Sequence, residues 1–170
     1  MWIETERLIL REFQLSDLQG LAPILANPLV MEFSPTGILS TQQTLEKIQN
    51  FMALYGEHGF GKWAVLLKAN QKLIGYCGIA VEKIEDTYEI EIGYRLTPRY
   101  WGMGLATEAA EKAISYGFNT FQFSYILGIV ERENLGSATV LQKLGMQFKK
   151  STLFHGVPMD IYRLNALASN

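Results

Sequence analysis

The sequence predicts a mixed α/β (α+β) domain, and three observations support this class. Segments with the alternation of strands are interspersed with segments of helical periodicity along the whole chain. Of the 170 residues, 48% are hydrophobic and only 19% are charged, which at this length supplies a sizeable core. No linker, repeat or low-complexity tract interrupts the series, so we expect a single domain over residues 1–170.

The first part of the chain is predicted to hold one strand, two helices and a hairpin. The apolar run at 7–13 reads as a strand. Ser16–Gln19 and Ser40–Gln43 each place a serine three residues before a glutamine, the pattern of a capping box that starts a helix. Residues 63–67 and 73–81 then change to strand character and are joined by a turn, as in an antiparallel hairpin.

The second part continues with alternating strands and helices. We expect a helix at 105–118 and a second at 134–144, where Gly145 fits the position after a helix end. The remaining elements are strands at 88–96, 123–130, 146–152 and 157–164, which brings the total to about seven strands and about four helices.

Composition excludes several classes of protein. Fifteen basic and 17 acidic residues give a net charge of −2, which offers no reason to expect nucleic acid or an anionic membrane as a partner. The single Cys77 cannot form an internal disulfide, and His58 and His155 do not form a zinc pattern, so we expect no metal. The uncharged stretch 113–130 contains several polar residues and a glycine, and the N-terminus carries charges where a signal peptide is apolar. These features predict a soluble, cytoplasmic protein.

The segment Arg99–Glu108, of sequence RYWGMGLATE, carries the most chemical information. It lies between a predicted strand and a predicted helix, where backbone N–H groups at a helix N-terminus can converge on an anion. Gly102 and Gly104 allow the main chain to approach a pyrophosphate closely. No Gly-Lys-Ser/Thr follows, so this is not a Walker loop, and a third glycine needed for a dinucleotide site is missing. Taken alone, the two glycines fit a tight turn equally well.

The longer segment Pro98–Ala109 resembles the acyl-CoA loop of the GNAT N-acetyltransferases, in the form found in the RimJ/RimL branch. Glu91–Tyr94 (EIGY) is similar to the family's fourth strand, and Asn134–Ser137 together with Leu141–Met146 resembles its N-x-x-S helix that ends in K-L-G-F. The opening Glu4–Arg11 is also similar to the branch's "T-E-R-L-x-L-R" start. The resemblance spans nearly the whole chain in the expected order.

This resemblance implies a GNAT fold with a mostly antiparallel sheet whose fourth and fifth strands splay apart to admit acetyl-CoA. The pantetheine arm would bond to the fourth strand as an added strand does, and the pyrophosphate would rest on the loop. Asn134 would bond the pantetheine amide region, and Lys143 would lie near the adenosine phosphates or simply be solvated. The donor-binding residues implied in this way are Ile92, Gly93, Tyr94, Leu96, Arg99, Trp101, Gly102, Met103, Gly104, Leu105, Ala106, Asn134, Ser137 and Lys143.

Catalysis in such an enzyme is direct transfer of acetyl to an amine that has lost its proton. Glu89 and Glu91 share one face of a strand, and either could take this proton, directly or through water. We favour Glu91, which aligns with EIGY, although both acids could equally decorate a solvent face. A backbone N–H near Ile92 or Gly93 would bind the oxyanion. Ser137 could protonate the departing sulfur, or it could act only as a local helix cap.

The amine acceptor is the least determined part of the prediction. Phe33, Tyr55 and Trp63 could line its pocket, although aromatic residues at such spacing are core by default. The acceptor would be a protein N-terminal amine or a small amine, on an enzyme that is a monomer or a homodimer. Two rival interpretations are a non-catalytic acyl-CoA-binding sensor or scaffold, and a transferase for longer acyl groups.

Overall fold

The computed structural model describes residues 1–167, and these fold around one sheet of eight strands. The strands are β1 (Trp2–Glu4), β2 (Leu8–Arg11), β3 (Lys62–Leu67), β4 (Leu73–Ile84), β5 (Thr87–Leu96), β6 (Tyr125–Glu131), β7 (Gln147–Phe154) and β8 (Val157–Asn165). The α-helices are α1 (Leu18–Leu25), α2 (Pro28–Met31), α3 (Thr41–His58), α4 (Leu105–Phe121) and α5 (Leu135–Lys143). The predicted class is confirmed. The described residues hold one strand and one helix more than predicted, because β1 and α2 are too short to show a period.

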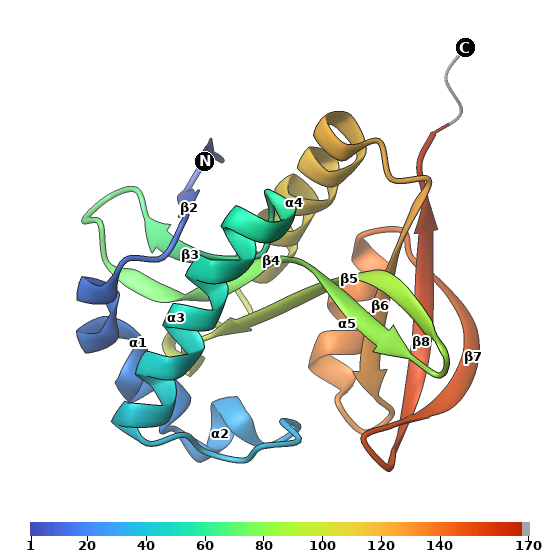
Figure 1. Ribbon diagram of the computed structural model, residues 1–170, viewed down its shortest axis with the longest axis horizontal. Coiled ribbons are helices and arrows are strands. Elements are labelled where there is room, and N and C mark those ends of the chain that lie inside the picture. The colour runs from blue at the N-terminus through green and yellow to red at the C-terminus, as the bar shows by residue number, and fades with distance from the viewer. Residues whose placement is uncertain (168–170) are drawn as a thin grey trace.

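The sheet is antiparallel except at its centre. Its strand order is β1-β2-β3-β4-β5-β6-β8-β7, and only β5 and β6 run parallel. That parallel contact is brief: it joins Glu91 to Leu127 and Ile92 to Gly128, after which the two strands separate. Figure 1 shows β5 running to the left, whereas β6 and β8 run nearly vertically on the right side of the view. The predicted splay between the family's fourth and fifth strands therefore lies between β5 and β6, because β1 adds one to the count.

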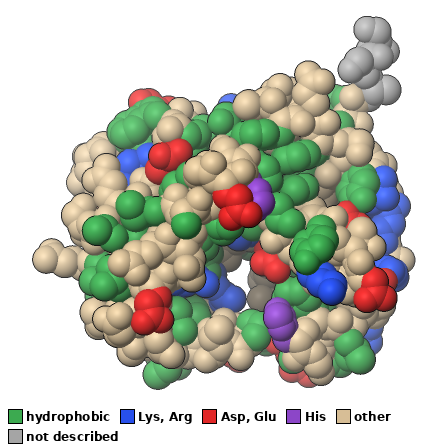
Figure 2. Space-filling model, in the orientation of Figure 1, with side chains coloured by type: hydrophobic (Ala, Val, Ile, Leu, Met, Phe, Trp, Pro, Cys, Tyr) green, Lys and Arg blue, Asp and Glu red, His purple; other side chains and the backbone are tan. Residues whose placement is uncertain are grey.

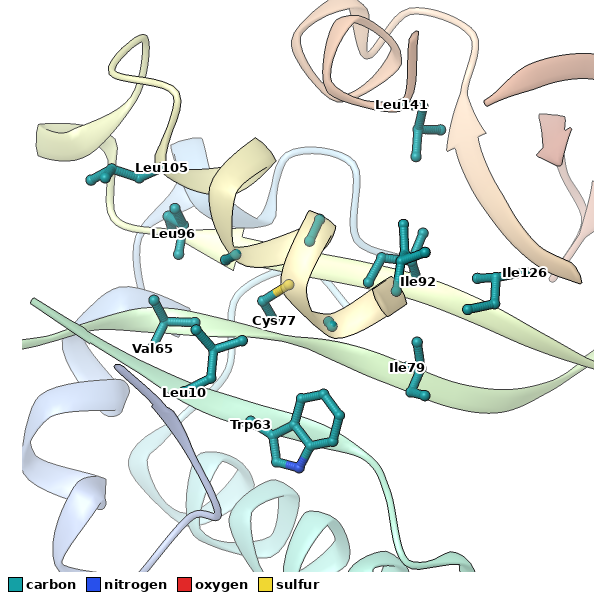
Figure 3. Packing of buried hydrophobic residues seen from close by; sticks show 14 of the residues in the cluster. Leu10, Trp63, Val65, Cys77, Ile79, Ile92, Leu96, Leu105, Ile126 and Leu141 are labelled. Carbon is teal, nitrogen blue, oxygen red and sulfur yellow. The ribbon is translucent and has the colours of Figure 1, made fainter. Parts of the chain in front are cut away.

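Two hydrophobic clusters cover the two faces of the sheet. On one face α4 and α5 pack over a cluster that includes Trp63, Cys77, Ile92 and Leu141. Figure 3 shows Leu141 reaching in from α5 on the side of Ile92. Burial raises the pKa of the Cys77 thiol to about 12, so this cysteine is a packing residue. On the other face α1 and α3 pack over a second cluster, which Tyr76 joins from β4.

The helix N-termini test the two predicted capping boxes. At α3 the box is confirmed: Ser40 Oγ accepts from the Gln43 N–H at 3.1 Å, and Gln43 Oε1 accepts from the Ser40 N–H at 2.8 Å. The box at Ser16 was wrong. Ser16 lies inside the 3₁₀ turn Leu15–Asp17, and the Asp17 carboxylate accepts from the Gln14 N–H at 2.8 Å while it pairs with Arg11. A buried ion pair thus decides where this helix begins.

Among the described residues, the helices are each too short or too polar to cross a bilayer.

Candidate active site

The loop between β5 and α4 presents free backbone N–H groups to solvent. Gly102 and Gly104 adopt φ values of +72° and +78°, a left-handed conformation that strains other residues. Gly104 is the residue that precedes α4, and it offers no side chain to bond the first N–H groups of this helix. Built Cβ atoms on these glycines meet nothing closer than Arg7 Nη2, 3.6 Å from the Cβ on Gly104. The loop therefore has donors and open space for an anion.

Arg7 and Glu108 hold this loop against the N-terminal segment. Arg7 Nη1 donates to the carbonyl oxygen of Met103 at 2.9 Å, while Arg7 Nε donates to Glu108 Oε2 at 2.7 Å. Glu108 also accepts from Thr5 and from the Arg7 N–H. Burial alone would raise the pKa of Glu108, but the bonds from Thr5 and Arg7 outweigh it and lower the pKa. Two motifs far apart in the sequence thus form one structural unit.

Beyond Ile92, β5 has an open edge. Gly93 to Leu96 pair with β4 on one side, and the ladder to β6 has already ended on the other. Backbone groups on an open edge can bond an extended ligand as an added strand. Trp101, half exposed, lies at the far end of this edge and donates its indole N–H to the Leu96 carbonyl oxygen at 2.8 Å. Trp101 is therefore a cover of the loop and not a core residue.

Tyr94 and Ser137 meet across the separation of the strands, on the face that α4 and α5 cover. The Tyr94 hydroxyl lies 3.0 Å from both the carbonyl oxygen and Oγ of Ser137. Burial raises the pKa of Tyr94, against the opposing effect of the bond to Ser137. Asn134 Oδ1 accepts from the Ser137 N–H at 3.2 Å, which caps α5 and leaves the amide NH₂ available for a ligand.

Glu91 lies on the opposite face of the sheet and forms an ion pair with Lys62. The Lys62 Nζ atom is 3.0 Å from Oε1 and 3.3 Å from Oε2 of Glu91, and it donates to the Gly78 carbonyl oxygen at 3.1 Å. The two side chains are only 10% and 14% exposed. Glu91 is thus a fixed, half-buried carboxylate at the point where the parallel pairing ends.

Gly93 makes this ion pair possible. Lys62 belongs to β3 and Glu91 to β5, so the lysine side chain must cross β4 to reach its partner. It passes over Gly78, and its ammonium occupies the space that a Cβ on Gly93 would take. The glycine of EIGY therefore has a steric role that the sequence pattern did not reveal.

Glu89, the other candidate base, has a different environment. Its Oε2 accepts from the Tyr125 hydroxyl at 2.7 Å, and Tyr125 is itself stacked under Arg163, whose guanidinium carbon lies 3.8 Å from the ring centroid. Glu89 shares the face of Glu91 by alternation, as predicted, but it lies before the paired segment and not beside the opening. The geometry favours Glu91.

A hollow lies on the α3 face of the molecule. Figure 2 shows it near the centre of the view, with basic, acidic and histidine side chains around it. Of the three aromatic residues predicted to line an acceptor pocket, Phe33 is half-buried after α2 and stays a candidate. Trp63 is a correction: it is fully buried on the other face, edge-on to Tyr116. Tyr55 bonds the backbone of Lys62 and Phe13, so its position serves the fold.

Two further residues complete the comparison with the sequence. Lys143 is exposed in the last turn of α5, nine positions or about 13 Å of helix from Asn134. Its predicted contact with adenosine phosphates stays a prediction. Lys62 was missed. The available signal was a lone lysine at the start of the otherwise apolar strand KWAVLL, because a buried lysine requires a partner.

Known proteins are similar to this chain in sequence and in fold. The family model "Acetyltransferase (GNAT) domain" matches residues 7–147. The uncharacterized N-acetyltransferase YoaA of Bacillus subtilis (strain 168) is 32% identical over 163 residues, which cover 93% of this chain and 92% of YoaA. A GNAT-family acetyltransferase crystal structure from Bacillus anthracis superposes with a TM-score of 0.84 at 26% identity, covering 97% and 98% of the two chains.

A structure of RimL, a ribosomal L7/L12 α-N-protein acetyltransferase in complex with coenzyme A, has a TM-score of 0.79 over 97% of this chain and 98% of RimL. At 16% identity this likeness concerns the fold alone. The extent of the family match and of YoaA decides the assignment: the chain belongs to the GNAT family and is an acetyltransferase.

Proposed function

We propose that this protein is an acetyl-CoA-dependent N-acetyltransferase that moves acetyl directly to a primary amine within a ternary complex. One observation carries the proposal. At the point where β5 and β6 part, a fixed carboxylate lies on one face of the sheet and a hydroxyl pair on the other. A thioester threaded through the opening would have a proton acceptor on the amine side and a proton donor on the sulfur side.

The donor substrate would be held by backbone groups. The N–H groups of Tyr100 and Trp101 already donate to the carbonyl oxygens of Thr97 and Pro98. The N–H groups from Gly102 to Ala106 would therefore bind the pyrophosphate, because the start of α4 is uncapped and helix N-termini favour anions. The pantetheine arm would bond the open edge from Ile92 to Leu96, with the free amide NH₂ of Asn134 on its other side. No residue of this set requires a metal.

Glu91 would receive the proton of the amine, directly or through one water. An α-amine has a pKa near ~7.7–8.0, whereas a lysine amine lies near ~10.4, so an α-amine requires less help. The ion pair with Lys62 fixes the carboxylate in one orientation, which favours catalysis by positioning. Glu89 and bulk solvent are the alternative acceptors of this proton.

The reaction then forms a C–N bond and breaks the C–S bond through a tetrahedral oxyanion. A backbone N–H near Ile92 or Gly93 would stabilise the oxyanion. The departing thiolate, whose thiol has a pKa near ~8.5, would take a proton from the Ser137 hydroxyl or from a water that it holds, and the serine oxygen would regain a proton through Tyr94 or from solvent. Tyr94 would relay or orient this proton.

Two classes of amine acceptor fit this chemistry. The opening motifs resemble the RimJ/RimL branch, which supports a protein N-terminal amine, and the hollow on the α3 face supports a small amine as well. Both carry the primary amine that the chemistry needs.

The exchange Glu91→Gln tests the base. Because a positioned base contributes about 10²–10⁴-fold, kcat should fall by that factor while the KM for acetyl-CoA stays unchanged. Glu89→Gln is the matched control on the same strand face, and it should keep most of the activity. The reverse pattern would move the role to Glu89, and two active variants would leave solvent as the base.

A further inference from the structure

Lys47 points from α3 over the aromatic side chains of the second core cluster. Its Nζ atom lies 5.3 Å from the centroid of the Phe51 ring and 6.0 Å from that of Tyr76. The side chain is half-buried, and burial lowers the pKa of Lys47, helped by the positive charges of Arg95 and Lys62. A cation held in this way is short of compensating charge.

Arg95 is the second cation of this region. It lies opposite Tyr76 in the register of β4 and β5, and its Nη1 donates to the carbonyl oxygen of Val30 at 3.1 Å. This bond and a side-chain contact with the Tyr76 hydroxyl leave other N–H donors of the guanidinium unused. An ion pair requires a nitrogen-to-oxygen distance of 4.0 Å or less. Within residues 1–167, no carboxylate oxygen comes that close to the side-chain nitrogens of Lys47 or Arg95.

The acids of the same face do not compensate these two cations. Glu91 is occupied by Lys62. Glu82 opposes the lowered pKa of Lys47, but this is the weakest of the effects on that lysine. Glu82 is itself half-buried, and both burial and the neighbouring Glu91 raise its pKa. Lys47 and Arg95 are therefore left without an ion-pair partner on the sheet face that carries the proposed catalytic carboxylate.

The distance along β5 between Arg95 and Glu91 limits the size of an acceptor that could contact both. Arg95 is four residues from Glu91 on the same strand face, roughly 13 Å between the Cα atoms at ~3.3 Å per residue. Lys47 lies between the two sites, within electrostatic reach of both Arg95 and Lys62, the partner of Glu91. An acceptor with an anion a few bonds from its amine fits such a spacing.

We propose that Lys47 and Arg95 bind a carboxylate of the acceptor, so that the substrate is a primary amine that also carries a carboxylate, as in an amino acid or an acidic peptide N-terminus. This inference rests on the proposed function, whose acceptor it specifies. The same positive charges disfavour a polyamine, because its second ammonium would be repelled. They also favour loss of the proton from the bound amine.

The test compares acceptors that differ only in charge. Glycine, β-alanine and γ-aminobutyrate are each assayed beside their carboxamides and the diamines of matching length. A peptide that begins with aspartate is assayed beside one that begins with asparagine. The kcat/KM should be at least about tenfold higher for the carboxylate in one of the two series, since a charge-assisted bond is lost in its partner. The series that shows the ratio identifies the source of the carboxylate.

Variants test whether Lys47 causes the higher kcat/KM for carboxylate acceptors. Lys47→Met keeps the length of the side chain, removes the charge and should bring the ratio close to one, and Lys47→Glu should turn the preference toward diamines. Lys112→Met, at an exposed position on α4, is the matched control and should keep the ratio. Equal rates for acid and amide in the wild type, or a retained ratio in Lys47→Met, would overturn the inference and leave the proposed function intact. Failure to acetylate any amine would overturn both.

Discussion

Arg7 and Glu108 lie 101 positions apart in the sequence, yet Arg7 Nε donates to Glu108 Oε2 at 2.7 Å. The same guanidinium bonds the Met103 carbonyl oxygen, so it connects the N-terminal segment, the glycine loop and the first turn of α4. The contact joins the Thr5–Arg7 segment to the glycine loop and the start of α4. Arg7 and Glu108 each supply half of a brace for the loop.

Removal of this brace should weaken donor binding more than stability. Arg7→Ala removes the hydrogen bond to the Met103 carbonyl group. The KM for acetyl-CoA should rise several-fold, because the loss in binding free energy is about that of one charged hydrogen bond. The free energy of unfolding should fall by only about 1 kcal/mol, because Arg7 is 44% exposed and solvent screens its charge. Glu85→Gln breaks an exposed ion pair with Lys150 and serves as the control for thermal melting and kinetics.

The same contact predicts a pH dependence of stability. The pKa of Glu108 is lowered in the folded state, so its contribution is fully present above the unfolded value of ~4.3 and is lost as the pH falls through the folded pKa. Glu108→Gln should therefore be less stable than the wild type at pH ~7 and approach it in acid below ~4. Melting curves across this range measure the difference. A gap between the two proteins that stays constant with pH would contradict this assignment.

Bulk at Gly104 should block the site of the pyrophosphate. Gly104→Val places side-chain atoms in open space beside the helix N-terminus and should raise the Kd for coenzyme A by about 100-fold or more. The φ value of +78° also strains valine by roughly 1–2 kcal/mol. Gly37→Val controls for this strain, because Gly37 has a φ value of +65° and open space but lies outside the loop. Calorimetric titration should find coenzyme A binding intact in that control.

A methyl group on Gly93 should separate Lys62 from Glu91. The Cβ atom would occupy the place of the Lys62 ammonium, which can move because it is the end of a flexible side chain. Gly93→Ala should therefore keep the fold but reduce kcat about tenfold or more as the carboxylate loses its orientation. Gly56→Ala, at an open position in α3, is the control. Full activity in Gly93→Ala would argue against a role for the ion pair.

Ser137 and Tyr94 should affect the chemical step together. Ser137→Ala removes the proposed proton donor and should lower kcat about 10–100-fold, and Tyr94→Phe should have a smaller effect in the same direction. The double variant should lose little beyond Ser137→Ala, because the two hydroxyls act as a unit. Thr139→Ala, on the exposed side of α5, controls for changes in the helix. Additive losses from the pair would separate the two roles.

The parts of the fold predicted from the sequence are those with local causes. The Ser40 box, the glycine turn after α5 and the loop before α4 each depend on residues within a few positions of one another. The start of α1 was predicted wrongly because Asp17 is held by Arg11 from the neighbouring strand, a contact that no local pattern shows. The prediction that Trp63 lines the acceptor pocket was wrong for a related reason. Alternation along a strand shows which residues share a face of the sheet, but not which face meets the cleft.

The candidate site divides in the same way. Glu91 and Ser137 were predicted because each belongs to a motif, and their catalytic roles stay predictions. Lys62 and the partnership of Tyr94 with Ser137 depend on the path of one side chain across β4 and on the placement of α5 against β5. These are tertiary contacts between residues far apart in the sequence, and only the three-dimensional structure shows that they lie together.

The most direct test of the account is release of the coenzyme A thiol from acetyl-CoA, measured with and without a panel of amines and with product analysis by mass spectrometry. The opening between β5 and β6, flanked by Glu91 and Ser137, predicts thiol release that requires an amine and matches the acetylated product mole for mole. Tight binding of acetyl-CoA with no amine-dependent release, across α-amines, lysine side chains and small amines alike, would contradict it and leave a binding module in place of an enzyme.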